Sequence, residues 1–230
     1  MNQILEINQI EFVLTFEDES KTNLDLQVLK QKEVIPRHWK IAESLIHTEE
    51  ISLLNFQNGI YILQRGDVLA FLETTNREKL PNLVVPEVMY QYLEKFPEES
   101  YQAFGVNVEG YIAFSNQDIA QNYLFETLFR FNSQHELDQR PAQAILNLIY
   151  KLDQGVLTLT AQNMEIAVPE QEGLSTIRFF GNFHHDISHF PEEERAHILR
   201  QLIMNWNTDV EIYREIVNSK FLNKQMVQVE

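Results

Sequence analysis

A short histidine-rich segment is the part of the sequence whose side chains could carry out chemistry. His184, His185, Asp186 and His189 lie close together, and His197 follows a little further on. Imidazole and carboxylate groups are ligands suited to zinc, manganese or iron. If the segment ends a strand, however, His185 faces away from its two neighbours, and one ion cannot reach all of them without a sharp bend. We keep two alternatives open: histidines hydrogen-bonded to backbone or solvent, and a pH-responsive contact.

Other catalytic signatures are missing from the sequence. It has no G-x-S-x-G elbow, no phosphate-binding G-x-x-x-x-G-K-[ST] loop and no G-x-G-x-x-G fingerprint. Glu109 lies in an expected strand and is a candidate for general acid–base work, but carboxylates are abundant in this chain. The sequence therefore predicts no cofactor and favours a non-enzymatic protein.

The composition is acidic and free of cysteine. The 230 residues include 34 Asp and Glu against 18 Lys and Arg, which gives a net charge of −16. This balance argues against a nucleic-acid-binding surface, which must neutralise phosphates. It suits solubility, binding of a basic protein, or mimicry of nucleic acid. Without a signal peptide, a long apolar segment or cysteine, the chain is expected to be globular and cytoplasmic.

Aromatic residues are the second functional hint. The chain has 15 Phe, 8 Tyr and 2 Trp, and Tyr and Trp are common anchors of protein interfaces. The expected interface residues are Phe125, Phe129, Trp206 and Tyr213, which predict a homodimer. Simple burial of these side chains in the core is the alternative.

Three apolar runs between 51 and 73 are separated by two turn signals. Asn58-Gly59 offers residues with positive φ, and Arg65-Gly66-Asp67 offers a second reversal. The segment therefore predicts a three-stranded antiparallel meander. Upstream, alternating apolar residues on both sides of a charged turn predict a hairpin over 9–29.

The next elements are a helix, a strand and another helix. The helix begins at Pro86, because proline has no N–H to leave unpaired, and it ends before Pro97. A strand follows over 101–114, in which glycines mark a bulge or a close backbone approach. A helix over about 117–131 begins at a capping-box pattern that starts with Ser115.

The second half has less regular signals. The segment 144–152 suits either a strand or a helix, and Gln162-Asn163 predicts a turn. Short strands are expected over 156–159, 164–168 and 174–183. An acidic first turn after Pro191 begins a C-terminal helix whose apolar stripe continues for about 28 residues.

The two meanders suggest a repeat. Asn58-Gly59 aligns with Gln154-Gly155, and Val68 to Glu73 with Met164 to Pro169. The chain would then consist of two similar halves, residues 1–131 and 142–230, with one continuous domain as the alternative. The expected fold class is α+β: antiparallel β-meanders packed against two medium helices and one long C-terminal helix.

These observations favour a cytoplasmic, non-enzymatic protein-interaction or adaptor and regulatory protein. It would act on a protein partner through an acidic and aromatic surface and would associate with itself. We expect no direct contact with nucleic acid or membrane. The first alternative is a metal-dependent hydrolase that uses the cluster His184, His185, Asp186 and His189. The second is an acidic nucleic-acid mimic or inhibitor.

Overall fold

The computed structural model describes residues 4–17, 24–42, 46–48, 50–97, 99–128, 145–166 and 174–222. The strands in these ranges are β1 (Glu6–Phe16), β2 (Ile46–His47), β3 (Ile51–Asn55), β4 (Ile60–Arg65), β5 (Val68–Thr74), β6 (Tyr101–Phe114), β7 (Ile145–Leu152), β8 (Gly155–Ile166) and β9 (Leu174–Asp186). The helices are α1 (Leu26–Gln31), α2 (Val85–Lys95), α3 (Gln117–Asn122), α4 (Glu192–Met204) and α5 (Trp206–Ile216). A 3-10 turn covers Leu80–Asn82, and π-helical turns cover Tyr123–Leu128 and Val217–Leu222.

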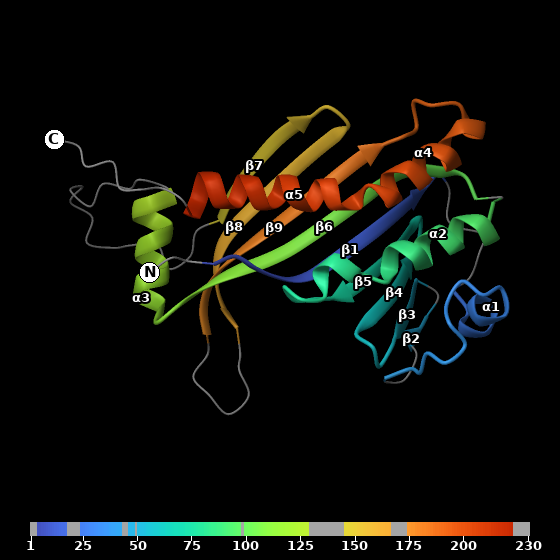
Figure 1. Cartoon of the computed structure of the whole chain (residues 1–230), viewed down its shortest axis with the longest axis horizontal. Helices are drawn as coiled ribbons and strands as arrows, with labels where there is room; N and C mark the ends of the chain where they lie inside the picture. Colours follow the sequence, from blue (N-terminus) through green and yellow to red (C-terminus); the bar gives the residue numbers. More distant parts are fainter. Residues whose placement is uncertain are drawn as a thin grey trace.

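All nine described strands join one antiparallel sheet, in the order β2-β3-β4-β5-β1-β6-β9-β8-β7 (Figure 1). The helices α2, α4 and α5 lie across one face of this sheet. The predicted α+β class, with antiparallel meanders and helices at the C-terminal end, is confirmed. No helix among the described residues is both long and apolar enough to span a membrane.

The meander predicted over 51–73 is confirmed as β3, β4 and β5. Gly59 and Gly66 make its two turns with φ angles of +83° and +56°, a region that residues with a side chain rarely adopt. Successive side chains of a strand point to opposite faces of the sheet. Ile60, Ile62 and Phe71 therefore lie on the helix-covered face, where all three are buried.

The sheet is organised around the antiparallel pair of β1 and β6, in which Glu11 lies opposite Asn107. On the outer sides of this pair, β5 pairs with β1 and β9 pairs with β6. The order strand, helix, meander, helix occurs twice, from β1 to α2 and from β6 to α4, and both units share one sheet; the division lies between α2 and β6, which differs from the predicted halves 1–131 and 142–230. The strand equivalent to Val68–Thr74 is Leu174–Asp186, whereas 164–166 is the end of β8, so the sequence alignment holds for the first turn and not for the second turn or the third strand.

The hairpin predicted over 9–29 is wrong. The partners of β1 are β5 and β6, and Leu26–Gln31 is a short helix. The side chain of Asp25 accepts a hydrogen bond from the N–H of Val28, which satisfies a free donor of the first turn. This local cap, together with the long-range pairing of β1, outweighs the alternation of Leu24, Leu26 and Val28.

The turn predicted at Gln162-Asn163 is also wrong, because β8 continues through it. Gln162 pairs with Arg178 and Asn163 with Ile177 of β9. The ambiguous segment before it forms the strand β7.

The expected C-terminal helix is present as two consecutive helices. The N–H of Asn205 donates to the carbonyls of Gln201 and Leu202, which closes α4, and α5 begins at Trp206. At this break the indole of Trp206 makes an edge contact with Phe12 of the central strand, at a ring-centroid distance of 5.8 Å.

Three elements of the middle segment follow the sequence closely. The predicted helix is α2, and the predicted strand is β6. Gly110 lies beside a bulge of β1, and a Cβ there would come within 2.9 Å of the Glu6 carbonyl oxygen, so the predicted close approach is present. The helix α3 begins as expected, but its cap is Asn116, whose side chain accepts from the N–H of Ile119. The predicted extension beyond residue 128 lies outside the described residues.

Candidate functional site

The structure separates the members of the histidine cluster. His184 and His185 are adjacent in β9 and therefore face opposite sides of the sheet; His184 is exposed and His185 is buried. The carboxylate of Asp186 accepts hydrogen bonds from the backbone N–H and the hydroxyl of Ser188, which lower the pKa of Asp186 below its usual value. The exposed ring of His189 lies against Phe190. In the ranges that the structure describes, no group of three or more His, Asp or Glu side chains is arranged to hold a metal ion.

His185 instead pairs with a residue that the sequence does not single out. Its Nε2 lies 2.8 Å from Oδ2 of Asp209 on α5, and its Nδ1 lies 2.7 Å from the carbonyl oxygen of Gln154. A carbonyl oxygen only accepts, so Nδ1 carries a proton. Both ring nitrogens are engaged, and neither is free to act as a general base.

The charge state of His185 follows from two opposing effects. Burial lowers the pKa of the imidazole, but the hydrogen bond and the negative charge of Asp209, together with the Gln154 carbonyl, outweigh burial and raise the pKa above its ordinary value. The pair therefore favours an imidazolium that donates to both oxygens. A cavity of about 550 Å³ borders His185, between the β7–β8 turn and α4.

Glu109, the candidate acid–base residue, is not free. Its carboxylate forms an ion pair with Arg178 of β9, on the face of the sheet away from the helices. A hydrogen-bonded row crosses the same face: Asn182 Nδ2 donates to Asn107 Oδ1 (2.5 Å), and Asn107 Nδ2 donates to Glu11 Oε2 (2.6 Å). The centre of this face is thus a network of polar groups that already have partners.

Of the four predicted interface residues, two are covered by the chain itself. Tyr213 is fully buried, and its hydroxyl donates to the carbonyl of Phe179 at 3.0 Å. Phe125 is also buried. This burial matches the alternative of simple core packing that the sequence left open. Trp206 is half-buried, and Phe129 lies outside the described residues.

The most exposed apolar element of the described chain is the edge strand β7, with the sequence ILNLIYKL. One side of β7 pairs with β8, and its outer side has no strand partner in the described residues. On the face away from the helices, Ile145 and Ile149 are 53% and 72% exposed. On the other face four side chains are only half-buried: Leu146, Leu148, Tyr150 and Leu152.

Comparison with known proteins adds no relative. No protein-family model matches the chain, and a search of curated proteins gives no significant match.

Two features of this description were missed by sequence reasoning. Asp209 carries no local signal, because its partner is on a distant strand. The edge position of β7 also depends on the strand order, although its lack of acidic residues in so acidic a chain was a signal that could have been found.

Proposed function

We propose that this protein is a cytoplasmic, non-enzymatic interaction protein that works as a homodimer, in which β7 of one copy pairs with β7 of a second copy. The observation that carries the proposal is the outer edge of β7, which contains apolar side chains and has no strand partner among the described residues. The lack of cysteine agrees with a reducing compartment.

An edge strand presents a row of free N–H and C=O groups, and proteins usually protect such edges with charges, proline or a covering element. β7 has eight residues, contains no proline and carries one charge, that of Lys151. Apolar side chains lie on both faces of the strand, with Ile149 on one and Leu148 on the other. A strand of this kind is suited to antiparallel pairing with another strand.

Charge favours a second copy of the chain as the occupant. Each copy has a net charge of −16, so two copies repel unless they meet where acids are absent. β7 is such a place. Because only residues on the same face can lie opposite each other, a two-fold axis at Leu148 places Lys151 of one copy opposite Ile145 of the other. Leu146 would lie opposite Tyr150, and no like charges would face each other.

In this arrangement the two sheets become one, and the half-buried leucines of β7 are covered from the side. The acidic surfaces of both copies stay free for a basic protein partner. The contact is thus apolar at the edge, and the acidic residues that dominate the composition serve recognition of a different protein.

The test is the oligomeric state across a range of concentrations, measured by sedimentation equilibrium. We expect the wild type to approach twice the chain mass of 27.1 kDa. Ile149→Lys adds a charge to an exposed position and should give a monomer at concentrations where the wild type is dimeric. Ile46→Lys is the matched control, because Ile46 is also an exposed isoleucine on an edge strand, at the opposite end of the sheet. A wild type that is monomeric throughout, or equal association of both variants, would contradict the proposal.

A further inference from the structure

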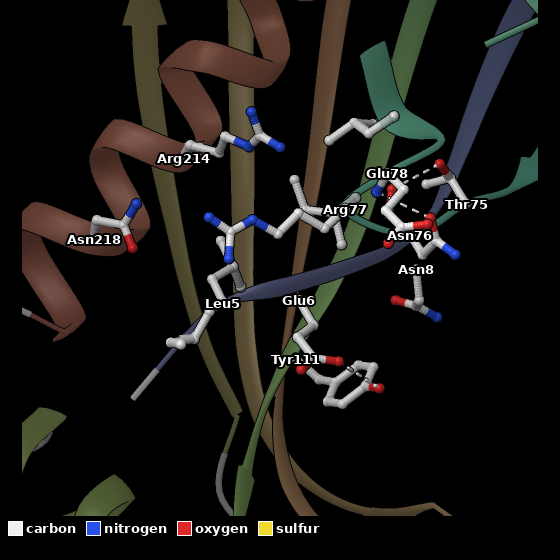
Figure 2. A pocket seen from close by; sticks show the side chains of 13 residues that line it. Leu5, Glu6, Asn8, Thr75, Asn76, Arg77, Glu78, Tyr111, Arg214 and Asn218 are labelled. Atoms are coloured by element: carbon white, nitrogen blue, oxygen red, sulfur yellow. Dashed lines mark hydrogen bonds between the residues drawn. The ribbon is translucent and has the colours of Figure 1, made fainter. Parts of the chain in front are cut away.

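A second cavity, of about 810 Å³, lies beside the N-terminal end of β1 (Figure 2). Four parts of the chain build it: the N-terminal end of β1, the segment that follows β5, Tyr111 of β6, and α5 with the turn after it. Ile7 and Leu80 form part of an apolar wall. The cavity therefore combines an apolar surface with the polar groups of a loop and a helix.

Two arginines from different elements reach into this space. Arg77 comes from the loop after β5 and Arg214 from α5, and both guanidinium groups extend toward the cavity in Figure 2. Neither forms an ion pair with a described residue. Four other arginines, in contrast, each lie against a carboxylate: Arg37, Arg178, Arg195 and Arg200. Two arginines without a carboxylate partner at one cavity are unexpected in a chain with 34 acidic residues.

One of the two carboxylates that line the cavity is already engaged. Glu6 accepts a hydrogen bond from the hydroxyl of Tyr111 at 3.2 Å, and in Figure 2 its side chain turns toward Tyr111 and away from Arg214. Burial, with the neighbouring Glu6 charge, raises the pKa of Tyr111, so its hydroxyl keeps the proton that it donates. Glu78 also lines the cavity. Glu78 forms no ion pair with either arginine in the described part of the chain, and Glu6 is held by Tyr111, so both guanidinium groups remain available to an anionic ligand.

The repeated architecture explains why a space remains here. In the unit from β1 to α2 the N–H of Thr75 donates to the carbonyl of Asn8 (2.8 Å), and in the unit from β6 to α4 the N–H of Ile187 donates in the same way to Gln102 (3.0 Å). We call the place where each of these backbone bonds forms a junction. Arg195 fills the second junction, beside Ile187, and its guanidinium donates to the carbonyls of Ser188, Phe190 and Tyr101. No described side chain fills the first junction in this way, so the cavity is left open there.

We infer that this cavity is a binding site for a small organic anion: a molecule with one carboxylate or phosphate group on an apolar body. The planar fork of an arginine fits either group with two parallel hydrogen bonds. Arg77 and Arg214 bind the anionic group, and the wall around Ile7 and Leu80 covers the apolar body. This site is separate in sequence and composition from β7 and does not depend on dimerisation.

The test uses the full chain and three aromatic probes of similar size. Phenyl phosphate and benzoate carry the two possible anionic groups, and benzyl alcohol is the neutral control. Binding is detected by saturation-transfer NMR and quantified by calorimetry. We expect at least one anionic probe to bind, and benzyl alcohol to bind at least tenfold more weakly. The tighter anion assigns the ligand to the phosphate or the carboxylate class.

Variants locate the site. Arg77→Gln and Arg214→Gln should each weaken the binding of the preferred anion at least tenfold. Arg65→Gln, an exposed arginine on β4 outside the cavity lining, should leave it unchanged. Three results would overturn the proposal. Neither anion binds at millimolar concentration, benzyl alcohol binds as tightly as the anions, or the double variant of Arg77 and Arg214 binds the preferred anion as tightly as the wild type.

Discussion

His185 of β9 and Asp209 of α5 meet inside the molecule, with Nε2 of the imidazole 2.8 Å from Oδ2 of the carboxylate. The contact connects α5 to the C-terminal end of β9. The Gln154 carbonyl on the other ring nitrogen extends the link to the β7–β8 turn. One histidine thus connects three elements, and its protonation affects all of them.

Stability should depend on pH through His185. Its pKa in the folded protein is raised above the ordinary value of 6.5. The folded state therefore binds a proton more tightly than the unfolded state. This contribution is fully present below about pH 6.5 and is lost as pH rises through the folded pKa. Urea unfolding between pH 5.5 and 9 should show a decline that His185→Gln removes and that His189→Gln, at an exposed position, leaves in place. Parallel curves for the wild type and His185→Gln would contradict this.

The same pair gives a prediction for substitutions. Asp209→Ala leaves a buried imidazole without its counter-charge and should lower the free energy of unfolding by about 3 kcal/mol. Replacing both His185 and Asp209 by leucine should be less harmful than Asp209→Ala alone, because no charge is then left unpaired. Urea unfolding at pH 6 measures both. A double variant that is clearly less stable than Asp209→Ala would show that the pair contributes more than charge compensation.

Gly181 is required by the packing of α5 on β9. A Cβ at this position would lie 2.7 Å from Cδ2 of the buried Tyr213 ring, which has no room to move. Gly181→Ala should therefore cost about 2 kcal/mol through overpacking. Gly105→Ala is the comparison, because its nearest atom would be 3.3 Å away, and the cost should be smaller. Thermal unfolding monitored by circular dichroism tests the difference. Equal stability of the two variants would mean that α5 can shift away from the sheet.

The hydrogen bond between Asn107 of β6 and Glu11 of β1 can be tested by a single change of charge. Asn107→Asp replaces the donor to Glu11 by a second carboxylate, and like charges directly opposite each other destabilise a sheet, here by about 1 kcal/mol at pH 7. The difference from the wild type should shrink at acidic pH, because protonation of a carboxyl removes the like-charge repulsion. Asn55→Asp adds the same charge on β3 opposite Tyr61 and should show no such recovery. Urea unfolding at pH 7 and pH 4 provides the comparison.

Local signals in the sequence were enough to predict the elements with their own turn or cap residues. The meander follows from the positive φ of Gly59 and Gly66, and α2 follows from Pro86 and its apolar stripe. Errors arose where a distant partner decides the structure. The alternating spacing of Leu24, Leu26 and Val28 predicts a hairpin with β1, but β1 pairs with β5 and β6.

The same limit applies to the candidate sites. The neighbouring histidines in the sequence suggest a shared metal ion. Because successive side chains of a strand alternate between faces, His184 and His185 lie on opposite faces of the sheet. The cavity with Arg77 and Arg214 combines residues that are far apart in the chain, and only the sheet order brings them together. The acidic composition, in contrast, could be read directly and is the basis of the charge argument for β7.

The most direct test of the proposed dimer uses cysteine. The chain has none, so a single introduced thiol reports one contact. Across a two-fold axis at Leu148 the two Cα atoms would be about 5 Å apart, within reach of a disulfide. After mild oxidation, Leu148→Cys should give a covalent dimer in high yield, and Ile46→Cys on the opposite edge should give little. If no substituted position along β7 gives more covalent dimer than Ile46→Cys, the pairing of β7 with its copy is contradicted.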